Sequence, residues 1–159
     1  MTLRNTRKNQ ELQLETRQTQ LFMNVYNNHI SLPTHTITIE LLHQWTWEDY
    51  DDFMAKYSLP NNLEANAKWS HYFASLEGLG ILIKKGVIDP DLVYSSQYGS
   101  IITIWEKFLP IIEEWRKRTD SPHLYEDPEY LYNEMIRMRN ERGHSPTITR
   151  IRDLTSNNP

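Results

Sequence analysis

The sequence contains no cysteine and only five glycines among its 159 residues. Without cysteine the chain has no disulfide bond, no thiolate metal ligand and no cysteine nucleophile. It also lacks the run of about 18 apolar residues that a membrane-spanning helix requires, and no apolar signal segment follows Met1. These absences predict a soluble protein of a reducing compartment, and we expect it in the cytoplasm.

Alternation of apolar and polar residues, the mark of a strand, is nearly missing as well. It occurs only in the short stretch HTITI, residues 35–39, which runs directly into ELLHQW. The remaining sequence has a helical period, and its length suits one domain with a proper core. We therefore predict an all-α, single-domain bundle of six or seven helices with a long N-terminal helix.

The expected helices follow from capping residues and from apolar faces. They span about residues 3–28, 33–45, 46–57, 61–85, 89–94, 99–118 and 127–141. Thr46 is the expected N-cap of the third helix, and helices 61–85 and 99–118 are the expected central pair. We divide the chain into a polar N-terminal helix extension (1–20), a helical domain (21–142) and a flexible C-terminal tail (143–159).

Charge is distributed unevenly along the chain, whose formal net charge is −4. Residues 1–20 carry four basic and two acidic side chains, whereas residues 40–64 carry six acidic side chains and one basic. The overall acidic balance argues against nucleic-acid binding. A candidate interaction surface for a basic partner is formed by Glu48, Asp49, Asp51 and Asp52. Its spacing lacks the glycine and the distal glutamate of an EF-hand.

The segment FASLEGLGILIKKGVIDPDLVY, residues 73–94, interrupts an apolar helix with one glutamate and two glycines. A phosphate-binding Gly motif follows a strand and opens a helix, so Gly78 and Gly80, which lie inside a helix, do not form one. Gly80 lies on the apolar face, where a glycine costs roughly 1 kcal/mol relative to alanine. We therefore predict a close helix crossing at Gly80, whereas Gly78 points to the opposite side.

Glu77 flanks the same apolar face, and we predict that it is at least partly buried. One interpretation is a pocket carboxylate with a raised pKa, walled by Trp69, Phe73 and Trp105. The alternative is a boundary carboxylate hydrogen-bonded to a neighbouring donor. No second carboxylate has a clear claim to pair with it, and the histidines lack metal-binding spacing. We therefore expect no catalytic residue, no cofactor and no metal.

The long first helix has a short 4-3-4-3 pattern typical of a coiled-coil seam. Its positions are Leu14, Gln18, Leu21, Val25 and Asn28. This pattern predicts a homo-oligomer that forms through the N-terminal helix.

Several segments resemble a prokaryotic, all-helical family of unknown function. They are RQTQLFMNVYN (17–27), WEDYDDFMAKY (47–57), residues 73–94, WEKFLPIIEEWRKR (105–118) and the segment around Tyr130. Many members carry one N-terminal transmembrane helix followed by a basic stretch. The resemblance thus implies a helical fold and a membrane tether, but no activity, ligand or catalytic residue.

The present sequence departs from that pattern because it has no membrane helix. Either this member is soluble, or the chain begins just after such a helix, with Arg4, Arg7 and Lys8 as its cytoplasmic flank. We therefore expect a non-enzymatic interaction or scaffold module, at the cytoplasmic face of a membrane, with an unknown protein partner. The alternative is a small-molecule sensor or enzyme with a pocket around Glu77.

Overall fold

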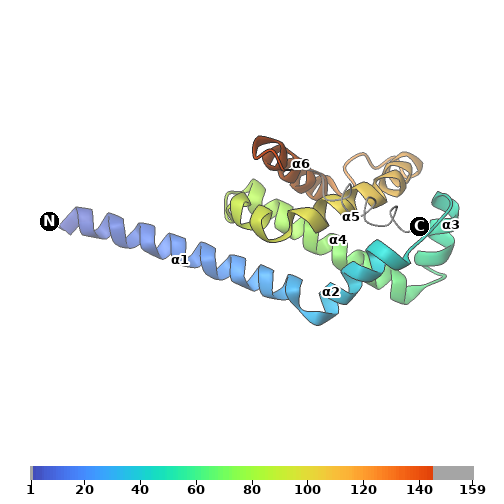
Figure 1. Ribbon diagram of the computed structural model, residues 1–159, viewed down its shortest axis with the longest axis horizontal. Helices are drawn as coiled ribbons and strands as arrows, with labels where there is room; N and C mark the ends of the chain where they lie inside the picture. The colour runs from blue at the N-terminus through green and yellow to red at the C-terminus, as the bar shows by residue number, and fades with distance from the viewer. Residues whose placement is uncertain (1, 145–159) are drawn as a thin grey trace, which may run out of the picture.

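The computed structural model describes residues 2–144, and over that range the chain is built entirely of helices, as predicted. They are α1 (Thr2–Ile30), α2 (Leu32–Ile39), the π-helix η1 (Glu40–Gln44), α3 (Tyr50–Tyr57), α4 (Leu63–Lys84), α5 (Pro90–Arg118) and α6 (Glu126–Glu141). Helices α4, α5 and α6 form the body, α3 lies at one end, and α1 projects far beyond the other end (Figure 1). From residue 145 on, the predicted C-terminal tail lies outside the described residues.

The N-terminal part of α1 makes little contact with the body. Residues 3–20 are exposed apart from Gln18, which is half-buried. Contact with the core begins at Leu21, Phe22 and Val25. Since Leu21 and Val25 pack on their own chain, the predicted coiled-coil seam is not free over its whole length. We call residues 3–20 the arm.

The chain turns sharply at Ser31, whose hydroxyl donates to the carbonyl of Asn28 at 2.7 Å. After α2 the helix widens into η1, and the Trp45 N–H donates to the Glu40 carbonyl at 3.1 Å. The Glu40 carboxylate lies 2.8 Å from the Lys68 ammonium of α4, and this hydrogen bond lowers the pKa of Glu40. The predicted single helix 33–45 is thus two elements, with a π-helical end fastened to α4.

Helix α3 begins later than predicted. Its N-cap is Asp49, whose side chain accepts from the Asp52 N–H at 2.9 Å, so the Thr46 prediction is wrong. Both residue types can cap a helix, but the backbone of Thr46 is engaged elsewhere. The Thr46 N–H donates to the Tyr57 hydroxyl at 3.0 Å, and the Tyr57 hydroxyl donates to the Thr46 carbonyl at 3.1 Å. Thr46 therefore anchors the end of α3 instead of its beginning.

Replacing Asp49 with alanine is expected to lower the free energy of unfolding by about 1 kcal/mol, because an orphan N–H at the helix start loses its acceptor. Thr46→Ala, which removes no hydrogen bond of the backbone, is the matched control and is expected to change it by less than about 0.5 kcal/mol. Urea unfolding measures both values. Equal losses in the two variants would contradict the assignment of Asp49 as the cap.

Helix α5 is one continuous helix, whereas the sequence predicted two segments, 89–94 and 99–118. Asp89 caps it by accepting the Asp91 N–H at 2.9 Å, and Pro90 follows at the first position. The stretch SSQYGS looks like a break, but Val93, Gln97 and Ile101 are buried one turn apart and continue one core-facing stripe. Burial of that stripe outweighs the low helix propensity of the stretch.

Helix α4 crosses α6 closely at Gly80, which confirms the prediction for this residue. A Cβ on Gly80 would overlap the Asp127 carbonyl oxygen and lie 2.8 Å from its carbon. One turn later, the Lys84 ammonium lies 2.7 Å from the Asp127 carboxylate. The predicted central pair, α4 and α5, does share aromatic contacts, but α6 packs closely against both of them.

An aromatic cluster fills the end of the body near α3. Its centre is Phe108, which is fully buried. The Phe108 ring lies 4.7 Å from Trp69 and 5.0 Å from Trp47, measured between ring centroids. Trp45, Phe53 and Phe73 also contact it, so one residue of α5 joins η1, α3 and α4.

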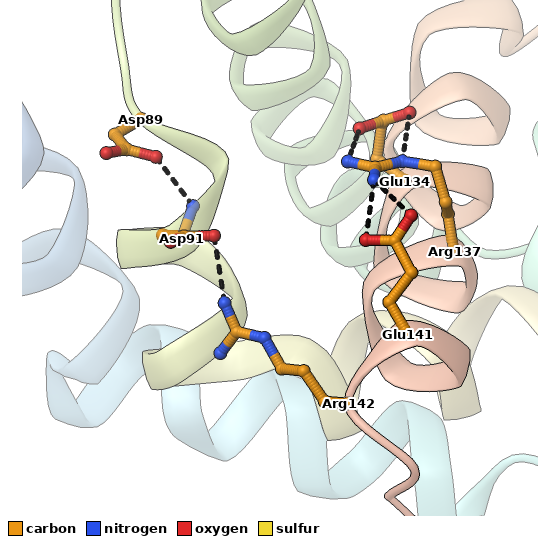
Figure 2. Close-up of polar contacts among 6 residues, drawn as sticks. All are labelled: Asp89, Asp91, Glu134, Arg137, Glu141 and Arg142. Atoms are coloured by element: carbon orange, nitrogen blue, oxygen red, sulfur yellow. Dashed lines mark hydrogen bonds and ion pairs between the residues drawn. The ribbon is translucent and has the colours of Figure 1, made fainter.

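Polar contacts fasten the end of α6 to the start of α5. Figure 2 shows Arg142 reaching Asp91, with Nη2 and Oδ1 2.8 Å apart. The Arg142 guanidinium also lies 4.4 Å from the centre of the Tyr94 ring. Along α6 itself, Arg137 pairs with Glu134 at 2.9 Å and with Glu141 at 2.8 Å. Exposed pairs of this kind contribute at most about 1 kcal/mol each.

Candidate functional site

The structure does not assemble the predicted pocket around Glu77. Glu77 is exposed, and nothing lies within 4 Å of a Cβ built on the adjacent Gly78, so this side of α4 faces solvent. Trp69, Phe73 and Trp105 are buried in the core. The prediction of a buried Glu77 is wrong. The apolar sequence around it does not imply burial, since nearby Ile81 is itself exposed and single exposed apolar residues are common.

The rings expected to wall a pocket instead make structural contacts. Trp69 stacks on Phe73 with centroids 4.1 Å apart, and its indole N–H donates to the Tyr125 hydroxyl at 2.9 Å. Trp105 stacks on Tyr132 at 6.0 Å. Burial raises the pKa of Tyr125, which therefore remains a neutral hydrogen-bonding partner. These contacts stabilise the core.

The predicted acidic surface lies along a groove between the start of α3 and the second half of α5. The groove has a volume of about 330 Å³. Its lining comprises Trp47, Glu48, Asp49, Tyr50, Asp51, Pro110, Ile111, Glu114 and Arg118. Asp52 is not among them; it accepts the Glu48 N–H at 3.0 Å and the Lys56 ammonium at 2.7 Å. We call this feature the acidic groove.

Arg118 already places a guanidinium group in the acidic groove. Its Nη1 lies 2.6 Å from the Asp51 carboxylate and its Nε 2.8 Å from Glu114. Its Cζ lies 4.5 Å from the centre of the Tyr50 ring. Two carboxylates and one aromatic face together suit a guanidinium ion. One guanidinium group of the protein itself therefore already occupies this groove.

Pro110 adds a hydrogen-bond acceptor close to the acidic groove. Proline has no N–H, so the carbonyl of Glu106, four residues earlier, lacks its helical donor. Pro110 is exposed, and α5 continues through it. The donors beside it are the Arg118 guanidinium, the Trp47 indole and the Tyr50 hydroxyl, which line the same groove.

Lys107 is an unusual residue that no local feature of the sequence marks out. Its ammonium donates to the carbonyls of Leu41, Leu42 and Trp45 at 2.6, 2.8 and 2.8 Å. Burial lowers its pKa. The carbonyls oppose that shift, because the charged form donates three hydrogen bonds and the neutral amine only two. With every proton engaged, Lys107 caps η1 and is no free nucleophile.

A second groove, of about 540 Å³, lies at the bend between α1 and α2. Its lining comprises Tyr26, His29, Ile30, His35, Thr38, Ile39, Leu42, His43, Ser96 and Ser100. Burial, and then the nearby His35, lower the pKa of His29, which favours neutral imidazole at neutral pH. The Ser96, Ser100 and Thr38 hydroxyls donate to backbone carbonyls of their own helices. Across residues 2–144, no group of three ligating side chains could hold a metal ion.

The predicted basic residues lie on the arm. Arg4, Arg7 and Lys8 are exposed, and within the described part of the chain none of them forms an ion pair or hydrogen bond. Their spacing of three and four residues places them on one side of the helix. The basic arm and the acidic groove lie at opposite ends of the molecule (Figure 1), so the structure does not bring the two predicted surfaces together.

These features define an all-α protein with a projecting basic helix and a carboxylate-lined groove. The chain belongs to a family described as a domain of unknown function, DUF4760, whose profile matches residues 4–135. This confirms the resemblance to a family of unknown function. No curated protein and no solved structure matches the sequence. No helix in residues 2–144 has both the length and the apolar content to cross a membrane.

Proposed function

We propose that this protein is a non-enzymatic interaction module that associates with a second copy of itself through the arm of α1. One observation carries the proposal: residues 3–20 continue α1 as a helix while they make almost no contact with the body. A helix that is polar all round and unpartnered has marginal stability in water. A partner that covers the arm supplies the missing stabilisation.

The alternative of a sensor or enzyme with a pocket at Glu77 receives no support from the geometry. Glu77 is exposed, and the rings expected around it are buried among themselves. The arm, in contrast, presents cations without partners on its own chain. We therefore place the function on the arm and on surfaces that match it.

A membrane surface is the second candidate partner, and it would place the protein at the cytoplasmic face. The observation in its favour is again the unpaired set of Arg4, Arg7 and Lys8 at the free end of the arm. Each such side chain near an anionic leaflet contributes about 1 kcal/mol. The same experiment can separate this partner from a second copy.

Sedimentation velocity over a range of concentrations tests the proposal with the full chain. We expect a dimer for the parent protein and a monomer for Leu12→Pro, because proline inside a helix costs about 3 kcal/mol. Leu12 is exposed on the arm, so the thermal unfolding of the body should not change. Leu12→Ala, which keeps the arm helical, is the matched control and should remain dimeric.

A parent protein that stays monomeric at every concentration would overturn self-association. If that monomer sediments with vesicles containing anionic lipid, and not with neutral vesicles, the membrane becomes the partner of the arm. If it binds neither, the interaction role of the arm is rejected.

A further inference from the structure

The molecule carries opposite charges at its two ends. The arm holds Arg4, Arg7, Lys8 and Arg17 against Glu11 and Glu15, and it projects away from the body. The acidic groove lies at the other end, beside α3 (Figure 1). Because the rigid body separates them, the arm of one molecule cannot reach its own groove.

The acidic groove has an excess of negative charge. Four carboxylates line it, those of Glu48, Asp49, Asp51 and Glu114, against the single guanidinium of Arg118. Asp51 and Glu114 share Arg118, and Asp49 caps α3. No hydrogen bond or ion pair within residues 2–144 engages the exposed Glu48 carboxylate. The groove can therefore accept a further cation without breaking the internal pairs.

The internal pair also shows which cation fits. Arg118 binds by carboxylate contacts and by lying over the Tyr50 ring. Trp47 is half-buried in the same groove; its ring stacks on Phe108, and its centre lies 5.4 Å from the Lys107 ammonium. Aromatic faces next to carboxylates bind arginine and lysine side chains. The free end of the arm presents two arginines and a lysine on one side of a helix.

We infer that two copies of the chain pair in antiparallel fashion, with the arm of each lying along the acidic groove of the other. The inference rests on the proposed self-association and names the surface that receives the arm. A two-fold axis makes both contacts at once, since each copy supplies one arm and one groove. The arm of about 18 residues is about 27 Å long.

The arrangement predicts a dimer that weakens with salt. Raising sodium chloride from about 50 mM to about 500 mM shortens the range of electrostatic attraction several-fold. We expect the dissociation constant of the full chain, measured by sedimentation, to rise by at least about tenfold over that range.

Charge reversal on the two surfaces is the decisive test. Glu48→Lys is expected to weaken the dimer at least about tenfold at low salt, because the two-fold axis places the change in both contacts. The triple variant Arg4→Glu, Arg7→Glu, Lys8→Glu is expected to abolish it. In an equimolar mixture of the triple variant with Glu48→Lys, the unchanged arm of the Glu48→Lys copy can bind the unchanged groove of the triple variant, so one native contact is restored. The mixed pair should therefore associate more strongly than the triple variant alone.

Glu113→Lys is the matched control. Glu113 is an exposed glutamate on α5 that does not line the groove, so its reversal should leave the dissociation constant within about twofold. A thermal unfolding midpoint for each variant verifies that the body is folded. If Leu12→Pro abolishes the dimer but Glu48→Lys and Glu113→Lys behave alike, the acidic groove is not the receiving surface, while association through the arm stands. A parent protein that never dimerises overturns both.

Discussion

Gly80→Ala is expected to lower the free energy of unfolding by about 2 kcal/mol, although alanine is the better helix former. The added Cβ would meet the backbone carbonyl of Asp127 on α6. The Asp127 carbonyl is part of the backbone of α6 and cannot change rotamer as a side chain can. Helix α6 must therefore move away from α4. That movement would loosen the contact between the Lys84 ammonium and the Asp127 carboxylate, now 2.7 Å apart.

Gly78→Ala, two residues earlier, is the matched control with the opposite sign. No atom lies within 4 Å of the Cβ it would add, and the position is exposed on the same helix. The propensity gain of up to about 1 kcal/mol should therefore appear in full. Urea unfolding of the two variants gives the comparison. A stabilised Gly80→Ala protein would show that α4 and α6 are not in close contact there.

Lys107→Met is expected to cost about 2–3 kcal/mol, because three buried carbonyl acceptors lose their donor while the side chain keeps a similar shape. The acceptors belong to Leu41, Leu42 and Trp45 around the end of η1. The ammonium also lies 5.4 Å from the centre of the Trp47 ring, and this cation–π contact would be lost too.

Lys117→Met, on the same helix, is the control for Lys107. Its side chain is 79% exposed and lies 3.7 Å from Glu114, so the loss should stay below about 0.5 kcal/mol. Lys107→Arg should fall between the two, since a planar guanidinium cannot place three donors where the ammonium does. Equal stability of the Lys107→Met and Lys117→Met proteins would contradict the capping role.

Much of the fold could be predicted from local sequence because the signals are local. The apolar stripe of α5 and its Asp89-Pro90 start each depend on a few neighbouring residues. The crossing at Gly80 was also predictable, since a glycine on an apolar helix face has few other uses. Its partner was not, because nothing near Gly80 in the sequence points to Asp127.

The wrong predictions have a shared cause. Burial of Glu77 was inferred from the composition of its own helix, but neighbouring helices decide which side of α4 is covered. The stretch SSQYGS has low helix propensity on its own, but Val93 and Gln97 are buried in the core and keep α5 continuous. Lys107 looked like any surface lysine, since the carbonyls that bind it come from residues more than 60 positions earlier.

For the candidate site, the sequence yielded the acidic and basic clusters but not their arrangement. The net charge of each segment can be counted, whereas their places at opposite ends follow only from the direction of α1 (Figure 1). The contribution of α5 to the acidic groove, through Pro110, Glu114 and Arg118, is likewise a product of tertiary structure.

The distribution of tryptophan gives the molecule an optical asymmetry. All five tryptophans lie between residues 45 and 115, and α1 contains none. Tryptophan fluorescence therefore does not report on the arm, whereas the far-ultraviolet circular dichroism signal includes its helical residues. The difference between the two signals isolates the conformation of the arm in an unlabelled, full-length chain.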